Sequence, residues 1–171
     1  MARDSVRIEG LDAVLRRLKA LGPEASKRGG PVRAAVRKAA TVIQKEAQAN
    51  VRRIVADPNI GGSDVSTGML EKSIKPMRAK APQKYKGETF FVTVPKRARY
   101  PISTKTPTGI GVATVGRILE YHEHKSADGT KHPPKPWMRP AFHAKKDEAV
   151  KVMTDELVKG ISRLERKLAK S

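Results

Sequence analysis

The sequence contains no cysteine, so neither a disulfide framework nor a thiolate metal site can stabilise the fold. Aromatic residues make up only 4% of the 171 residues, and no stretch approaches the roughly 18 apolar residues that a membrane-spanning helix needs. The first residues, Met1-Ala2-Arg3-Asp4-Ser5, lack the apolar run of a secretory signal peptide. These absences predict a protein without a signal peptide or a membrane span. Its fold must be stabilised by packing or by oligomerisation.

Acidic residues are also scarce, since 17 Asp and Glu face 36 Lys and Arg, for a formal net charge of +19 and a pI near 10.5. Such self-repulsion favours an acidic partner, most often nucleic acid, or an assembly in which neighbours supply the opposing charge. The excess is spread along the whole chain, which argues against a detachable basic tail. Solvated helix faces and a nucleic-acid footprint both remain open as interpretations.

Apolar residues recur at steps of three and four in three segments, the spacing of one face of a helix. The first segment runs from Leu11 to Leu21 and is stopped by Gly22-Pro23. The second begins near Pro31 and is rich in alanine as far as Val51. The third begins near Trp137 to Pro140 and continues for almost thirty residues. These patterns predict two helices in the N-terminal third and one long C-terminal helix.

Strand-forming residues are concentrated in the middle of the chain. Thr89-Phe90-Phe91-Val92-Thr93-Val94 and Ser73-Ile74-Lys75 are rich in β-branched and aromatic residues, and they predict an antiparallel hairpin with its turn within residues 82–87. A brief strand over Val112-Ala113-Thr114-Val115 is expected next, followed by a turn of helix through residues 118–121.

This order of elements predicts an α+β fold, with N-terminal helices and a long C-terminal helix packed on one face of a small antiparallel β-sheet. The length suits a single domain over residues 1–171. Turn formers and prolines place exposed loops near residues 54–68, 95–111 and 122–136.

Catalytic and metal-binding patterns are weak in this sequence. His122, Glu123 and His124 lie together, but no spacing marks a third metal ligand, and such residues in a polar loop are ordinary surface residues. Gly61-Gly62-Ser63 and Thr108-Gly109-Ile110-Gly111 lack the Lys-Ser/Thr that follows a phosphate-binding loop. We therefore expect no cofactor, no metal and no enzymatic activity.

The loop at residues 95–111 is basic and punctuated by proline. Lys96, Arg97, Arg99 and Lys105 can contact phosphates, and Tyr100 can stack on a base. The candidate DNA-facing residues are the four basic ones, Lys96, Arg97, Arg99 and Lys105. The alternative is an exposed loop that is basic because the whole protein is basic.

Residues 133–142 form the most unusual segment, in which prolines precede the only tryptophan. Trp137, Met138, Arg139 and Phe142 are of the residue types enriched at protein interfaces, and they are candidate partner-binding residues. Alternatively, Trp137 and Phe142 fasten the start of the last helix to the core.

Several motifs together resemble the tail-completion, or head-tail joining, family of long-tailed, lambda-like bacteriophages. They cover nearly the whole chain in the family's order: Gly10-Leu11-Asp12, Val36-Arg37-Lys38-Ala39-Ala40, Ala47-Gln48-Ala49-Asn50, Thr67-Gly68-Met69-Leu70, Leu119-Glu120-Tyr121, Gly129-Thr130 and Pro136-Trp137-Met138-Arg139-Pro140-Ala141-Phe142. The chain departs from the family in the insertion of residues 122–128, in a longer loop at residues 95–111, and in Trp137, where a Phe is usual.

This resemblance implies a structural subunit of a ring, commonly of six copies, in the neck of the virion, assembled in the host cytoplasm. The implied partners are other copies of the chain, the neighbouring tail-tube or tail-terminator protein, the head-completion protein and double-stranded DNA in the lumen, bound non-specifically. The resemblance adds Tyr121 to the candidate partner-binding residues. A stand-alone basic nucleic-acid-binding protein is the alternative hypothesis.

Overall fold

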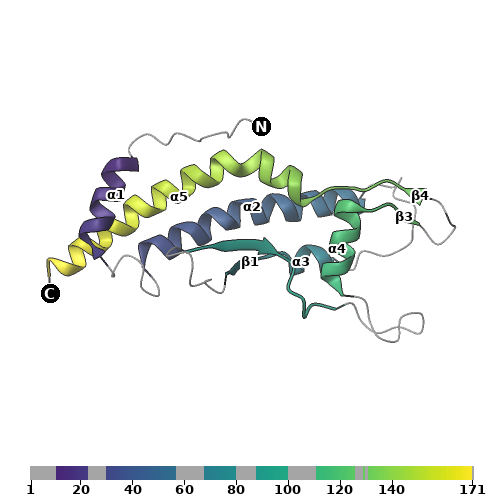
Figure 1. Cartoon of the computed structure of the whole chain (residues 1–171), viewed down its shortest axis with the longest axis horizontal. Coiled ribbons are helices and arrows are strands. Elements are labelled where there is room, and N and C mark those ends of the chain that lie inside the picture. Colours follow the sequence, from purple (N-terminus) through teal and green to yellow (C-terminus); the bar gives the residue numbers. More distant parts are fainter. Residues whose placement is uncertain are drawn as a thin grey trace.

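The computed structural model describes residues 11–22, 30–56, 68–79, 88–99, 111–125, 129 and 131–170. Two long helices, α2 and α5, lie side by side along the body, and shorter elements cover them (Figure 1). The α+β class is confirmed. The elements are, in chain order, α1 (Leu11–Ala20), α2 (Pro31–Ala56), α3 (Met69–Ser73), β1 (Lys75–Arg78), β2 (Phe90–Thr93), α4 (Val112–Tyr121), β3 (His124–Lys125), β4 (Lys131–His132) and α5 (Met138–Leu168).

The α2 and α5 helices pack closely because small residues face each other along their contact. Pro31 at the start of α2 lies against Gly160, where an added Cβ would come within 2.6 Å of the proline Cβ. At the other end, the Asn50 side chain donates a hydrogen bond of 3.0 Å to the Trp137 carbonyl, so the two helices run antiparallel. The other small buried residues are Ala35, Ala40 and Ala47 of α2 and Ala141 and Ala149 of α5. The two helices predicted for these segments are confirmed.

The predicted antiparallel hairpin is confirmed, with Met77 opposite Phe91 and Lys75 opposite Thr93. It packs on α2, and the Gln44 side chain donates a hydrogen bond of 2.9 Å to the Ile74 carbonyl beside it. The predicted start of the first strand was wrong, because Ser73 closes helix α3. Its successor Ile74 donates its N–H to the Glu71 carbonyl at 3.2 Å, which completes a helical turn before β1 begins.

The strand predicted over residues 112–115 is also wrong, because these residues open helix α4. Val115 donates its N–H to the Gly111 carbonyl at 3.2 Å, and the Val112 side chain is fully buried in the core. Tertiary packing of an amphipathic helix thus overrides the strand preference of β-branched residues. The helical turn expected over residues 118–121 is the second half of α4. A short antiparallel pair, β3 with β4, lies within the predicted loop of residues 122–136.

The α1 helix packs across the C-terminal part of α5 (Figure 1). Its Val14 is buried, and Arg17 donates a hydrogen bond of 3.0 Å from Nε to Glu165 and another of 3.1 Å from Nη2 to Ser162. None of the helices in the described part of the chain is long and apolar enough to cross a membrane.

The main apolar core lies at the opposite end, where the end of α2 meets α3, α4 and the start of α5. Its buried members are Ala47, Val51, Leu70, Ile74, Val94, Val112, Trp137 and Ala141. This core therefore fixes the segment that the sequence marks as unusual. Most of the predicted loops at residues 54–68 and 95–111 lies outside the described residues, and the single-domain organisation stays a prediction.

Candidate assembly site at the start of the C-terminal helix

The first turn of α5 is held by a carboxylate from another helix. Glu120 of α4 is only 3% exposed, and its Oε2 accepts hydrogen bonds from the backbone N–H groups of Trp137 at 2.7 Å and Met138 at 2.8 Å. Its Oε1 accepts a third from the Arg139 N–H at 3.1 Å. The first N–H groups of a helix have no partners within the helix and carry a partial positive charge. A buried carboxylate satisfies both demands at once.

The local sequence completes this arrangement. Pro140 follows the three N–H groups that Glu120 binds, and a proline has no N–H to satisfy. The Trp137 side chain does not cap the helix itself. The donors from Trp137 to Arg139 thus match the capacity of one carboxylate, which accepts several hydrogen bonds through its two oxygens.

Trp137 lies in the core and is only 5% exposed. Its indole Nε1 donates a hydrogen bond of 2.9 Å to the Gly116 carbonyl of α4. A Cβ at Gly116 would come within 3.2 Å of the Trp137 ring and 3.0 Å of the Leu70 side chain, so this position needs glycine for close approach. The interpretation in which Trp137 fastens the helix start to the core accounts for its position.

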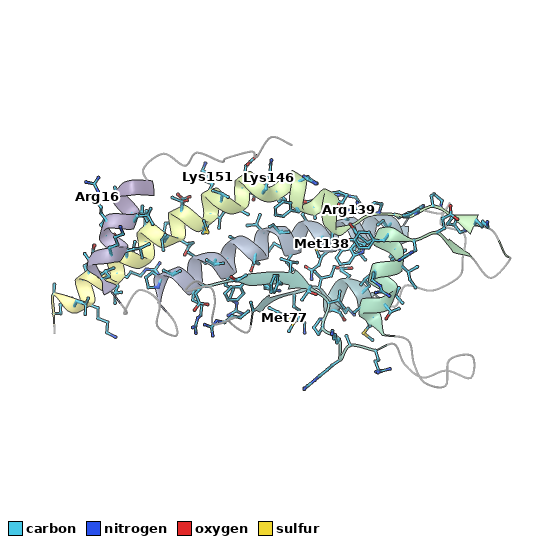
Figure 2. The ribbon with its side chains drawn as sticks, viewed as in Figure 1. Arg16, Met77, Met138, Arg139, Lys146 and Lys151 are labelled. Atoms are coloured by element: carbon cyan, nitrogen blue, oxygen red, sulfur yellow. The ribbon has the colours of Figure 1, made fainter. Side chains whose placement is uncertain are left out.

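Arg139 and Tyr121 form the exposed side of the same junction. The Arg139 Nε donates a hydrogen bond of 3.2 Å to Glu120 Oε1, and its guanidinium lies 4.9 Å from the centre of the Tyr121 ring. Both side chains are more than half exposed. Figure 2 shows Met138 and Arg139 where α5 begins, beside α4. A cation–π contact thus joins the two side chains at the surface of this junction.

Burial on its own raises the pKa of the Glu120 carboxyl, but hydrogen bonds from the Met138, Trp137 and Arg139 backbone and from the Arg139 guanidinium outweigh it. The net pKa is therefore lower than the ordinary value of 4.5. The Glu88 pKa is also lowered, chiefly by the Arg78 side chain against the opposing effect of burial, with help from Arg33. Glu88 fixes the hairpin to α2, because Arg33 belongs to α2 and Arg78 to β1.

Acid is expected to destabilise the protein through these two carboxylates. A depressed folded-state pKa contributes stability that is present above the unfolded pKa and is lost as the pH falls through the folded pKa. The urea midpoint should therefore decline steadily below about pH 4.5, because these carboxyls then take up protons more readily in the unfolded chain than in the folded protein. Unfolding of the parent and of Glu120→Gln at a series of pH values tests this, since the variant should show a shallower decline. Equal pH dependence in both proteins would contradict the role of Glu120.

An apolar groove lies beside this junction, between β2 and α5, with α2 as its floor. Its volume is about 440 Å³, within the range of ligand-binding clefts. A smaller hollow beneath Glu120 and Tyr121 shares Val92 and Met138 with it, so the surface is continuous from α4 to α5. The lining residues of the groove are Val36, Ala39, Ala40, Ile43, Phe90, Phe91, Val92, Met138, Arg139, Phe142 and His143.

The structure brings the five candidate partner-binding residues together at one end of the molecule. Tyr121, Arg139 and Phe142 are exposed, Met138 is half-buried and Trp137 is buried. Their binding of a partner stays a prediction.

The candidate DNA-facing residues are less fully described. Lys96 and Arg97 are exposed in a turn after β2, and the exposed Arg99 pairs in an isolated bridge with Gly111. Lys105 lies outside the described residues. Contact of these side chains with DNA stays a prediction.

Glu120 is the residue of this site to which sequence reasoning assigned no role. Its partners lie 17 to 19 positions further along the chain, beyond the reach of any local capping pattern. The available signal was a lone glutamate in the apolar helix Ile118-Leu119-Glu120-Tyr121, because a carboxylate on a buried face requires a partner.

Comparison with known proteins identifies one family for this chain. The family model of bacteriophage HK97 gp10, described as a tail component, matches residues 12–121, from α1 to the end of α4. No curated protein and no solved structure is significantly similar to the chain.

The matched residues include α1, α2 and the hairpin, and they define the chain as a phage tail component. The chain belongs to the HK97-gp10-like family of siphovirus tail components. The resemblance to a phage tail family is thus confirmed. The protein is a structural component that belongs to the virion.

Proposed function

We propose that this chain is the tail-completion subunit of its phage, forming a ring that joins the tail to the head and lines the DNA passage. The observation that carries this proposal is the exposure of aromatic side chains on one continuous surface. Phe91 is 58% exposed, Tyr121 56% and Phe142 50%. A contiguous exposed apolar patch with a polar rim is typical of a protein-protein interface. Other copies of the chain are the proposed occupants, with tail-tube or tail-terminator and head-completion proteins as the neighbouring rings.

A basic ridge supports the proposed contact with DNA. Lys151, Lys159, Arg163 and Lys167 of α5 are exposed and follow one another at steps of four or eight residues, interrupted by Asp155. Figure 2 shows Lys146 and Lys151 projecting from α5 away from α2. Residues four apart on a helix form one ridge, and a row of cations attracts a phosphate backbone without regard to sequence. Passage of any genome sequence requires this kind of contact.

We further infer that the protein has no catalytic turnover. The two most buried of the described carboxylates, Glu88 and Glu120, each have structural partners: two arginines in one case and a helix start in the other. Neither is paired with a nucleophile in the manner of an acid-base site.

Substitution of Tyr121 tests the proposed self-assembly. Tyr121→Ser removes an exposed ring that borders the interface, so it should weaken association of the subunits by about tenfold or more without changing the melting temperature. The neighbouring His122, which is also exposed, supplies the matched control His122→Ser. Sedimentation velocity over a range of concentrations gives the masses.

Imaging of virions that carry a tagged subunit supplies the second arm, since a ring at the neck is the expected location. A parent protein that stays monomeric at all concentrations and still binds DNA tightly would favour the stand-alone nucleic-acid-binding protein.

A further inference from the structure

Within the described part of the chain, the outer edge of β2 pairs with no other strand, so it can accept an additional one. Ala79 donates its N–H to the Thr89 carbonyl at 2.9 Å, in the same register that pairs Met77 with Phe91. Because alternate residues of an antiparallel strand bond to the same neighbour, the N–H and C=O groups of Phe90 and Val92 point away from β1. These groups have no hydrogen-bond partner among the described residues.

The open edge borders the apolar groove. A strand added beside β2 would lie about 4.8 Å from it, above Val36, Ala39, Ala40 and Ile43 of α2 and next to Phe142 of α5. A helix is about 10 Å wide and would leave the β2 backbone groups unpaired. The site therefore fits an extended segment whose alternate residues are apolar.

Residues 4–9 of this chain, Asp-Ser-Val-Arg-Ile-Glu, have this pattern. Val6 and Ile8 alternate with polar residues, which is the period of a strand with one buried face. The segment also begins and ends with a carboxylate, whereas the polar lining of the groove consists of Arg139 and His143 and contains no acidic residue. Pattern and charge are thus complementary to the groove.

The segment must come from a second copy. Helix α1 begins on the side of α5 that faces away from the hairpin (Figure 1). Ile8 precedes Leu11 by three residues, which span at most about 10 Å, and a helix with its side chains is about 10 to 12 Å across. Ile8 of the same chain therefore cannot pass α5 and reach β2.

We propose that residues 4–9 of one copy add to β2 of a neighbouring copy as a third, antiparallel strand. Val6 lies opposite Val92 and Ile8 opposite Phe90, with both side chains on the α2 floor. Arg7 then lies opposite Phe91 on the outer face. This contact rests on the self-assembly of the proposed function and specifies one of its interfaces.

Cysteine cross-linking tests the pairing without background, since the chain has no cysteine of its own. Arg7→Cys and Phe91→Cys are prepared as separate proteins, mixed and oxidised mildly. Opposite residues that are not hydrogen-bonded to each other have Cα atoms about 4.5 Å apart, which suits a disulfide. The expected product is a mixed disulfide dimer, identified by mass spectrometry.

Met77→Cys is the matched control for Phe91→Cys. It is exposed opposite Phe91 on the same face of the hairpin, but it lies two strand spacings, about 10 Å, from the added segment. It should therefore give no mixed disulfide with Arg7→Cys.

Deletion of residues 2–9 provides a second measurement. Amide hydrogen exchange at Phe90 and Val92 should lose its protection in the assembled protein, while the α2 amides stay protected. Unchanged exchange, or equal cross-linking yields from the Phe91 and Met77 variants, overturns the third-strand contact. If the parent is associated by sedimentation in that experiment, the proposed ring survives and this contact alone fails. A parent that never associates overturns both.

Discussion

Replacing Glu120 with glutamine is expected to lower the melting temperature by about 6 to 12 °C. In the parent, Glu120 Oε2 accepts hydrogen bonds from the N–H groups of Trp137 and Met138. The glutamine amide keeps one acceptor oxygen but places an NH₂ donor against N–H groups. It also removes the negative charge that faces the helix start and Arg139. Charged hydrogen bonds and an unsatisfied buried donor together cost about 3 kcal/mol, and each kcal/mol corresponds to about 2 to 4 °C in a domain of this size.

Glu123→Gln is the matched control, because Glu123 lies three residues further on and is exposed. This variant should melt like the parent. Calorimetry gives the melting temperatures. Hydrogen exchange locates the damage, which should begin at the Trp137 to Arg139 amides. A Glu120→Gln protein that melts with the parent would show that the carboxylate does not hold the helix start.

Trp137→Ala is expected to be still more damaging, at about 3 to 5 kcal/mol for a truncated core aromatic, or about 6 to 20 °C in melting temperature. The substitution opens a cavity against Gly116 and Leu70 and removes the hydrogen bond from the indole to the Gly116 carbonyl. Trp137→Phe keeps most of the ring volume and should lose only the hydrogen bond and part of the packing. Calorimetry should therefore rank the parent first, Trp137→Phe second and Trp137→Ala last.

A double-mutant cycle distinguishes the close contact between Gly116 and Trp137 from a general loss of core volume. In the parent, Gly116→Ala places a Cβ within 3.2 Å of the Trp137 ring and should destabilise the fold. In the Trp137→Ala background the same change meets empty space on that side and should cost less. Strict additivity of the two substitutions would contradict the close approach of α4 to Trp137.

The sequence predicted the elements whose signals are local. Periodic apolar residues located α2 and α5, and β-branched residues located the hairpin, because side chains alternate between faces at different periods in helices and strands. The strand prediction for Val112 and Val115 was wrong because it rested on another local signal, the intrinsic preference of valine for strands. The helical state of this segment depends on packing of Val112 into a core formed with residues distant in the sequence, which a local pattern does not contain.

The site was predictable only in part. The residue types of Trp137, Arg139 and Phe142 identified the segment as a candidate interface. Which of them is buried and which is exposed depends on the three-dimensional structure. Trp137 faces the core and Phe142 faces outward although both lie at the same helix start. Glu120 could be assigned only once α4 and the start of α5 were seen to touch, because its hydrogen bonds join segments that the chain separates by β3 and β4.

The clamp at the start of α5 also makes this helix a lever. Besides the Glu120 hydrogen bonds, Lys135 donates its N–H to the Leu119 carbonyl at 2.8 Å, so a load applied at Tyr121 passes directly into the α5 backbone. The 31-residue helix extends about 46 Å at 1.5 Å per residue, and near its far end Glu165 is bound to Arg17 of α1. A neighbour that tilts one end of the subunit by a small angle therefore displaces α1 by several ångströms at the other.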